Sequence, residues 1–213
     1  MTSSSDEQTP QGTVVRSAGV VAVEGMPGAG KTTAVTTLAD RGHTVLGEYT
    51  DDHARSLTLA AHPHHDDEHP HLANWLRKDA QARHLAPANN VVTDRNWLTA
   101  LAWSASVGGL PDRAGWAYLQ LSAGRLTLPE CWIILDCTVE TSLTRRRERL
   151  DPTHPWARPE PLDRLRAFYT DPADAVRPTL PALADALATV SMVRIDAEAD
   201  RDAVGHAICE AMP

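Results

Sequence analysis

The sequence predicts an α/β protein in which helices flank a parallel sheet of five strands. Apolar segments of strand length alternate with helix-like stretches along the chain, and this alternation is typical of parallel sheets. A glycine-rich segment, residues 25–32 (GMPGAGKT), joins the first apolar segment to the first helix-like stretch. Strand, glycine-rich loop and helix in this order are the context in which such a loop binds phosphate.

The expected elements follow the hydrophobic pattern in order. Strands are expected at residues 19–24, 43–48, 90–94, 131–136 and 191–195. Helices are expected at residues 31–40, 71–86, 97–106, 112–123, 139–149, 161–169, 180–187 and 200–212. Prolines between positions 129 and 161 mark loops and helix starts. Residues 1–18 are rich in Ser, Thr and Gln and are expected to form a disordered tail, which leaves residues 19–213 as a single domain.

The composition is that of an ordinary globular protein, with 42% apolar and 23% charged residues among 213. A formal net charge of −8 argues against general binding to nucleic acid or to a membrane surface. No apolar run approaches the length of a transmembrane helix, and the N-terminus has no secretory pattern. The three cysteines lack metal-ligand spacing and are odd in number, so we expect reduced thiols in a cytoplasmic protein.

The glycine-rich loop carries the chemistry of a phosphate site. Its glycines allow successive N–H groups to point into one concavity, and the following helix adds its positive N-terminal end. Lys31 is one of only two lysines in the chain, so the composition hardly supplies it by chance. We expect the loop to hold ATP and the Thr32 hydroxyl to hold Mg²⁺; the alternative is a glycine-rich turn without a ligand. The expected cofactor-binding residues are Gly25, Pro27, Gly28, Ala29, Gly30, Lys31, Thr32 and Thr33.

Acidic residues close four of the expected strands, at the sheet edge where ligands of open parallel sheets bind. They are Glu24, Glu48, Asp94 and Asp136. Asp94 is suited to hold Mg²⁺, and the adjacent Arg95 to bind a phosphate or carboxylate; the alternative is a helix N-cap beside a surface arginine. Glu48 ends the second strand, where a carboxylate can orient or deprotonate an acceptor hydroxyl. Asp51 and Asp52 are rivals for that role, and a solvated loop acid is the alternative for each of the three.

An arginine-rich segment, residues 144–149 (TRRRER), follows the fourth expected strand. Beside the proline-rich residues 151–161 it is typical of a lid, at about residues 145–160, that closes over a transferring phosphoryl group. Arg145 and Arg149 share one face of a helix, so we expect them to act together. The alternative is a solvated basic helix face paired with neighbouring glutamates.

These motifs, in this order, resemble the thymidylate kinase and deoxynucleoside kinase branch of P-loop kinases, from residue 19 onward. Residues 93–97 (TDRNW) are similar to the Asp-Arg-Tyr or Glu-Arg-Ser segment of that branch, and residues 144–149 to its lid arginines. Glu48 falls where deoxynucleoside kinases carry their catalytic glutamate, whereas thymidylate kinases carry Arg-Glu-Pro there. The resemblance implies the P-loop NTPase fold and catalytic roles for Lys31, Glu48, Asp94, Arg95, Arg145 and Arg149.

The expected acceptor site lies between the second and third strands. Trp75 and Gln81 loosely resemble the base-binding helix of deoxynucleoside kinases, and Arg83 could reach a phosphate or carboxylate on the acceptor. Trp75, Trp97 and Trp103 could stack on a flat ring, and the alternative is a place in the core. The expected acceptor-binding residues are Glu48, Asp51, Trp75, Gln81, Arg83, Arg95 and Trp97.

Residues 62–71 (HPHHDDEHPH) have no counterpart in that resemblance, although acceptor specificity is usually set in this region. Their five histidines and three acids allow three interpretations, namely a transition-metal site, a contact with a polar acceptor or a solvated loop. Irregular spacing and the lack of cysteine partners argue against structural zinc.

The sequence therefore favours an ATP-dependent kinase that transfers the γ-phosphate to a nucleoside- or nucleotide-like small molecule, with Mg²⁺ as the metal. A phosphotransferase acting on a hydroxyl of a secondary metabolite or antibiotic is the alternative. A regulatory NTP-binding switch is a third hypothesis. Kinases of this resemblance are commonly dimers, so a homodimer is left open, as is the choice between a hydroxyl and a phosphate on the acceptor.

Overall fold

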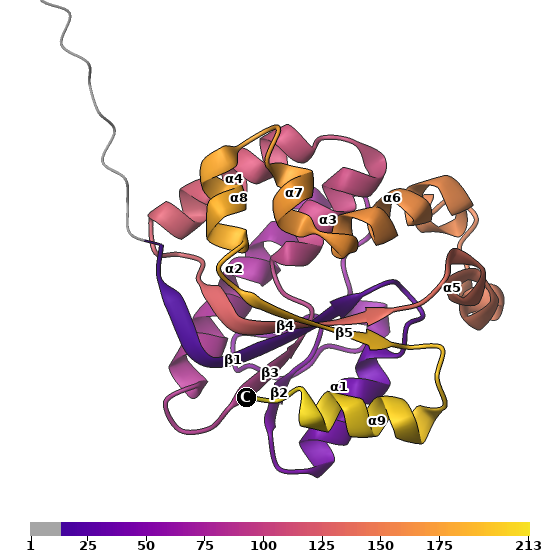
Figure 1. The fold of residues 1–213 in the computed structure, drawn as a ribbon, viewed down its shortest axis with the longest axis horizontal. Coiled ribbons are helices and arrows are strands. Elements are labelled where there is room, and N and C mark those ends of the chain that lie inside the picture. Colours follow the sequence, from indigo (N-terminus) through magenta and orange to yellow (C-terminus); the bar gives the residue numbers. More distant parts are fainter. Residues whose placement is uncertain (1–13) are drawn as a thin grey trace, which may run out of the picture.

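The computed structural model describes residues 14–213, in which a five-stranded parallel sheet lies between two layers of helices (Figure 1). The strands run in the order β2-β3-β1-β4-β5, and every neighbouring pair is parallel. This confirms the expected fold class. The strands are β1 (Arg16–Gly25), β2 (Thr44–Leu46), β3 (Val91–Asp94), β4 (Leu128–Asp136) and β5 (Ser191–Asp196).

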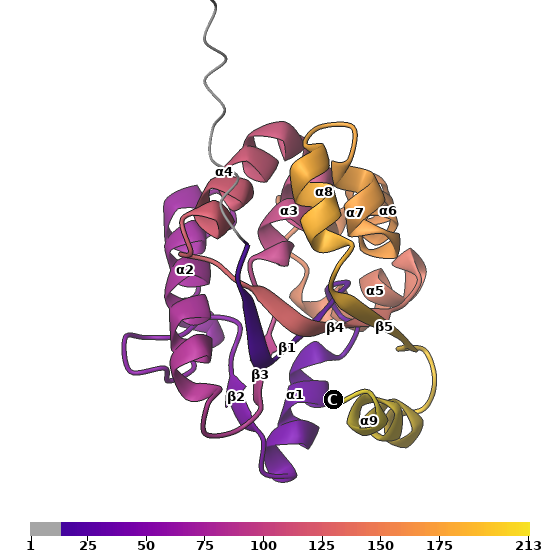
Figure 2. The same cartoon turned by 60° about the vertical axis from the view of Figure 1, so that its left-hand side comes forward.

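Two helices, α1 (Lys31–Asp40) and α9 (Arg201–Glu210), cover one face of the sheet (Figures 1 and 2). The other face carries α2 (Glu68–Leu85), α3 (Leu98–Val107), α4 (Leu110–Ser122), α6 (Pro159–Thr170), α7 (Pro172–Val176) and α8 (Pro181–Leu187). Helix α5 (Val139–Arg146) lies beyond the carboxyl end of β4. Short 3-10 turns are η1 (Leu59–Ala61), η2 (Arg147–Arg149) and η3 (Pro155–Ala157).

The hydrophobic pattern explains this layering. Because helices cover both faces of the sheet, its central strands are apolar without alternation, as the fully buried VVAV and IIL segments of β1 and β4 show. Proline occupies the first turn of α6, α7 and α8, where no helical N–H bond is lost. Among the described residues, no helix combines the length and the apolar character that a membrane crossing requires.

Several expected boundaries are wrong. The expected tail overlaps β1, which starts at Arg16 and pairs with β4 on both sides of an irregularity near Gly19, a residue at φ +74°. Residues 1–13 of that tail lie outside the described residues. Strand β2 ends at Leu46, so Glu48 lies beyond the strand. Helix α2 begins at Glu68, inside the histidine-rich segment, because a proline is tolerated in a first helical turn. The helix expected at residues 139–149 ends at Arg146 and continues as a 3-10 turn, and α7 was not expected.

Candidate active site

The phosphate-binding loop connects β1 to α1 at the carboxyl edge of the sheet. Gly25 lies at φ +128°, and a Cβ at this position would stand 2.2 Å from the Leu135 carbonyl oxygen, so only glycine fits here. Lys31 is 6% exposed, and its ammonium donates to the carbonyls of Gly25 at 3.2 Å and Met26 at 2.7 Å. Burial, and then the neighbouring Arg95, lower the pKa of Lys31 to about 7. The predicted lysine therefore lies inside the loop that would cradle phosphate.

A hydroxyl and a carboxylate meet beside this loop. The Thr32 hydroxyl donates to Asp94 Oδ2 at 3.1 Å, and Asp94 itself is 3% exposed. The parallel register of β1 and β3, which pairs Val23 with Asp94, places the carboxylate next to the loop. Asp94 Oδ1 is buried and accepts no hydrogen bond from the described residues. A hydroxyl beside an unpartnered carboxylate oxygen fits Mg²⁺, which takes oxygen ligands.

Arg95 links this carboxylate to the candidate base. Its backbone lies at φ +64°, in a region that non-glycine residues rarely adopt, and its guanidinium is buried. The guanidinium pairs with Glu48 Oε1 at 3.0 Å and donates to the Gly25 carbonyl at 3.2 Å. Burial alone would raise the pKa of Glu48, but Arg95 and then Lys31 and Lys78 outweigh it and hold the pKa below its usual range. Glu48 is therefore ionised at neutral pH.

A second carboxylate, Glu24, lies beneath the loop and is fully buried. It accepts hydrogen bonds from the Asn96 backbone N–H at 2.7 Å, the Thr99 hydroxyl at 2.7 Å and the Tyr169 hydroxyl at 2.8 Å. Burial raises the pKa of Glu24, and Arg95, 3.9 Å away, opposes this. Glu24 thus ties the loop strand to the end of β3 and to α6. The sequence places Glu24 at the end of the first expected strand, beside the loop, but gives no sign of its hydrogen-bond partners.

One face of α2 holds the segment that follows β2. Asn74 donates to the Glu48 carbonyl at 3.0 Å and accepts from the Thr50 N–H at 3.2 Å. Gln81 donates to the Asp51 carbonyl at 2.6 Å and accepts from the Thr50 hydroxyl at 2.7 Å. The side-chain amide of Gln81 is therefore engaged with the chain itself, although the sequence suggested a contact with the acceptor base.

Lys78, on the same face of α2, is 1% exposed, and its ammonium donates to the carbonyls of Gly47, Glu48 and Asp94. Burial lowers the pKa of Lys78 to about 8. The rarity of lysine in this chain is the one sequence signal that points to Lys78.

Three other expected acceptor residues are placed elsewhere. Trp97 is 1% exposed and belongs to the core, where its indole N–H donates to the Thr127 carbonyl at 2.9 Å. Arg83 pairs with Asp79 at 3.0 Å, on the side of α2 that faces Thr127. Asp51 closes its own turn by accepting from Arg55, which lowers the pKa of Asp51 to about 2. Each of these side chains is engaged by a partner within the protein, and its expected contact with an acceptor stays a prediction.

Aromatic and imidazole rings border the segment that carries Glu48. The Tyr49 ring lies 4.4 Å from the His62 ring and 5.7 Å from the Trp75 ring, and its hydroxyl bonds to His71. Trp75, which the sequence placed at the acceptor, is only 3% exposed. Two of the five histidines of the unmatched segment thus pack directly against the residue that follows Glu48.

The arginine-rich segment contacts the phosphate-binding loop through α5. Arg145 donates to the carbonyls of Gly28 at 3.4 Å and Ala197 at 2.9 Å. Arg146 is not among the catalytic residues expected from the sequence. Its side chain packs against Gly28 and donates to the Trp156 carbonyl at 2.7 Å. Arg149 is exposed and makes no hydrogen bond or ion pair within residues 14–213. The pair nearest the loop is thus Arg145 and Arg146, because α5 ends before Arg149.

The segment at residues 147–158 packs on α3 and on the histidine-rich segment. The Trp156 ring lies 5.0 Å from the Trp103 ring, and its indole N–H donates to the Ser106 hydroxyl at 3.0 Å. The His154 ring lies 4.6 Å from the His65 ring. Burial, and then His65, lower the pKa of His154 to about 4. These contacts bring the expected lid against α3 and the histidine-rich segment.

The sheet topology and the glycine-rich loop between β1 and α1 together define a P-loop protein. A family model described as an AAA domain matches residues 20–171, and the chain belongs to this family. No curated protein matches the sequence.

Solved structures of deoxyadenosine kinase from M. mycoides share the fold. The structure with bound dATP has a TM-score of 0.57 at 15% identity and covers 89% of this chain and 97% of that chain. The structure with the products dCMP and a flexible dCDP has a TM-score of 0.55 at 15% identity and covers 91% and 96%. The structure with bound dCTP has a TM-score of 0.55 at 14% identity and covers 90% and 97%. At this identity the likeness concerns the fold alone, and it confirms the fold that the resemblance implies.

Proposed function

We propose that this protein is an ATP- and Mg²⁺-dependent phosphotransferase that phosphorylates a hydroxyl of a small, nucleoside-like molecule. The observation that carries the proposal is the contact between Arg95 and Glu48, which lies beside the loop lysine and the unpartnered oxygen of Asp94. A phosphate site alone serves many reactions. A buried arginine that holds an ionised carboxylate next to that site supports transfer to an acceptor.

The residues divide the reaction between them. The loop N–H groups and Lys31 hold the β- and γ-phosphates of ATP, and Thr32 and Asp94 hold the metal, which neutralises phosphate charge. Glu48 accepts the proton of the acceptor hydroxyl while the hydroxyl oxygen forms a bond to the γ-phosphorus of ATP. The bond between the γ-phosphorus and the oxygen that bridges it to the β-phosphate breaks, and ADP leaves. Arg95 positions Glu48, and Arg145 and Arg146 add positive charge at the loop.

The cations of α2 favour a hydroxyl over a phosphate on the acceptor. A phosphate-bearing acceptor needs a free cation opposite it. The three cationic side chains of α2 are engaged elsewhere, since Arg77 donates to the Thr50 carbonyl, Lys78 to three carbonyls, and Arg83 pairs with Asp79. Glu48 would also repel a dianion.

A hydroxyl on a secondary metabolite or antibiotic is the second candidate acceptor. Two observations favour it. Gln81, the residue that loosely resembled a base-binding position, uses its amide to hold Thr50 and Asp51. The rings of His62 and His71 flank Tyr49 instead, and they suit a polar acceptor that differs from a nucleobase.

An acceptor panel tests both candidates. Purified protein is incubated with ATP, Mg²⁺ and one member of each class: nucleosides, nucleoside monophosphates and hydroxylated metabolites such as aminoglycosides, and ADP release is measured. We expect release to depend on a nucleoside or a metabolite hydroxyl and not on a monophosphate. A rate of ADP release that is the same with and without each acceptor would instead support an NTP-binding switch.

A further inference from the structure

A buried lysine side chain, Lys78, connects the carboxyl ends of β2 and β3 next to the proposed site. The β2–β3 pairing ends at Leu46 and Thr93, so the carbonyls that follow have no partner in that ladder. Lys78 reaches this point from α2, and its ammonium donates to the carbonyls of Gly47 at 3.0 Å, Glu48 at 3.0 Å and Asp94 at 2.7 Å. The lysine therefore joins the two strand ends beyond their last paired residues.

The three contacts use the whole donor capacity of the side chain. An ammonium group has three N–H donors and no acceptor, and each donor of Lys78 has a backbone carbonyl. The residue is 1% exposed, and its nitrogen lies 4.7 Å from the centre of the Trp75 ring. Lys78 is thus enclosed by the protein, so it acts on the reaction through its neighbours: it holds the carbonyls of Glu48 and Asp94, and its charge also lowers the pKa of Glu48.

Two of those residues are the proposed base and the proposed metal ligand. Glu48 and Asp94 lie on different strand ends, and the side chains of both approach the phosphate-binding loop. We propose that Lys78 is a positioning residue that fixes the spacing between Glu48 and Asp94. With this spacing, the proposed base and the proposed Mg²⁺ ligand lie on the same γ-phosphate. This inference rests on the proposed metal role of Asp94.

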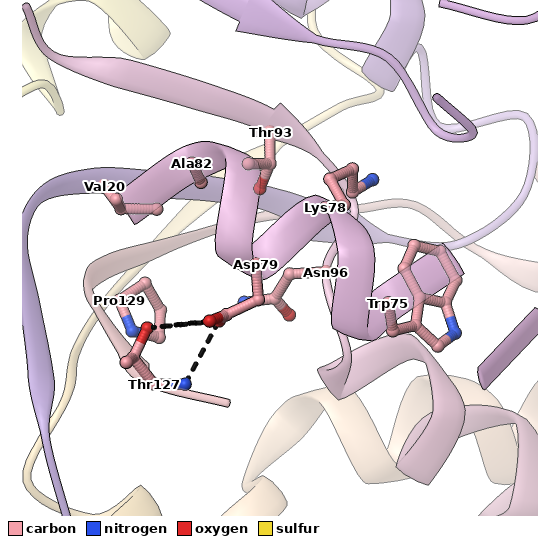
Figure 3. A pocket seen from close by; sticks show the side chains of 9 residues that line it. All are labelled: Val20, Trp75, Lys78, Asp79, Ala82, Thr93, Asn96, Thr127 and Pro129. Atoms are coloured by element: carbon pink, nitrogen blue, oxygen red, sulfur yellow. Dashed lines mark hydrogen bonds between the residues drawn. The ribbon is translucent and has the colours of Figure 1, made fainter. Parts of the chain in front are cut away.

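The neighbouring residue on α2 supplies a matched control. Asp79 is also mostly buried, but it accepts hydrogen bonds from the backbone N–H and hydroxyl of Thr127 at 3.1 Å. Figure 3 shows Lys78 and Asp79 leaving α2 in different directions, with Asp79 hydrogen-bonded to Thr127 at the wall of a small cavity that both residues line. Asp79→Asn disturbs a buried polar contact of the same helix without touching the strand ends.

Nucleotide affinity measured with and without the metal tests the proposal. ATP is titrated into wild type, Lys78→Met, Asp79→Asn and Asp94→Asn by calorimetry, once with Mg²⁺ and once with EDTA. Removing a group that supports a metal ligand typically costs about 10- to 100-fold in metal-dependent affinity. We expect Lys78→Met to lose at least roughly tenfold in Mg²⁺-dependent ATP affinity, as Asp94→Asn does. ATP affinity in EDTA should stay within about twofold of wild type, and Asp79→Asn should match wild type in both conditions.

A further variant separates positioning from packing. Lys78→Arg keeps a positive charge and several donors but is bulkier, so a role in packing alone would make it worse than Lys78→Met. A positioning role predicts that Lys78→Arg recovers part of the Mg²⁺-dependent affinity, and this variant also serves if Lys78→Met fails to fold. Wild-type Mg²⁺-dependent affinity in Lys78→Met, beside a loss in Asp94→Asn, overturns the proposal. Wild-type Mg²⁺-dependent ATP affinity in Asp94→Asn would show that Asp94 does not hold the metal. That result would contradict both the proposed metal site and the role of Lys78.

Once an acceptor is identified, steady-state kinetics provide a second readout. Misplacing the base and the metal ligand weakens interactions made in the transition state, so kcat of Lys78→Met should fall while KM for the acceptor changes little. A rise in KM with unchanged kcat would contradict the positioning role.

Discussion

At the scale of single residues, the site is an arrangement of buried charges in which each is held by an opposite charge or by backbone carbonyls. Lys31, Lys78 and Arg95 are all less than 7% exposed and surround Glu24, Glu48 and Asp94. Burial without partners would neutralise such groups. Their mutual contacts keep Glu48 ionised, and these contacts explain why single substitutions here should affect activity strongly.

The loop lysine gives the first prediction. Lys31→Ala removes the only lysine inside the phosphate cradle, so phosphoryl transfer should be abolished while the fold is retained. ADP release and circular dichroism measured on the same preparation check this. Retained transfer would exclude the loop from the mechanism.

The proposed base gives the second prediction. Glu48→Gln preserves size but cannot accept the acceptor proton, so kcat should fall by roughly 10²-fold or more. Asp51→Asn tests the rival in the same loop; because Asp51 is engaged by Arg55, we expect a near wild-type rate. A normal rate in Glu48→Gln combined with a loss in Asp51→Asn would transfer the role to Asp51.

At the scale of elements, tight contacts between the loop, α5 and β4 fix the shape of the phosphate site. The Ser142 hydroxyl donates to the Pro27 carbonyl at 2.7 Å, and Arg146 packs on Gly28. Gly25 is bounded by the backbone of Leu135. The loop proposed to bind phosphate is therefore shaped partly by segments more than a hundred residues away.

A comparison of two loop glycines forms the third prediction. Both have positive φ, which costs a non-glycine residue about 1–2 kcal/mol. Gly25→Ala must also move the Leu135 backbone, whereas a Cβ at Gly30 would meet nothing within 4 Å. In urea unfolding, Gly25→Ala should therefore lower the free energy of unfolding clearly more than Gly30→Ala does. Equal losses would show that the loop relaxes freely around Gly25.

The fourth prediction concerns the segment expected to form the lid. The pKa of His154, about 4 when packed against His65, lies below the ordinary 6.5. The released segment therefore binds a proton more tightly, so packing should be intact above pH 6.5 and weaken as the pH falls towards 4. Hydrogen exchange at residues 150–158, corrected for its intrinsic pH dependence, should increase at pH 5 relative to pH 7.5.

His154→Asn provides the matched variant for this measurement. An asparagine can still accept from the Trp156 N–H as an N-cap, but it does not titrate in this range. The acid-dependent increase in exchange should be reduced in this variant. An equal increase in both proteins would assign the effect to another group.

At the scale of the whole molecule, a buried carboxylate on the side of α2 that faces Thr127 links stability to pH. Burial raises the pKa of Asp79 to about 6, against hydrogen bonds from Thr127 and the charge of Arg83. The unfolded chain releases this proton near the ordinary value of 3.8. The contribution of Asp79 to stability is therefore complete below pH 3.8 and is lost as the pH rises through 6.

The fifth prediction follows from this linkage. Between pH 4 and pH 7, wild type should lose up to roughly 3 kcal/mol of unfolding free energy through Asp79, since one pKa unit corresponds to about 1.4 kcal/mol. Asp79→Asn should lack this loss, so the difference between the two proteins should shrink or reverse as the pH rises. Denaturant unfolding at several pH values measures it, and parallel pH curves would contradict the assignment.

Local patterns were enough to predict the fold class and the place of the glycine-rich loop between β1 and α1. The strand–loop–helix arrangement around Lys31 depends on a few consecutive residues, and the five apolar segments depend on hydrophobic periodicity. Both are properties that neighbouring residues determine. Gly19 shows the limit, since its irregularity lets β1 extend to Arg16 through pairing with β4, a strand more than a hundred residues away.

The sequence by itself determined the parallel α/β class, the glycine-rich loop and the acidic residues that follow the strands. Each of these depends on a few consecutive residues, namely an apolar run, a glycine pattern or a carboxylate after a strand. Only the tertiary structure decided which side chains remain free for an acceptor. It engaged Gln81, Arg83 and Trp97 within the protein and placed Lys78 across two strand ends. The reason is that burial and pairing depend on residues brought together from distant parts of the chain, and no local pattern records those partners.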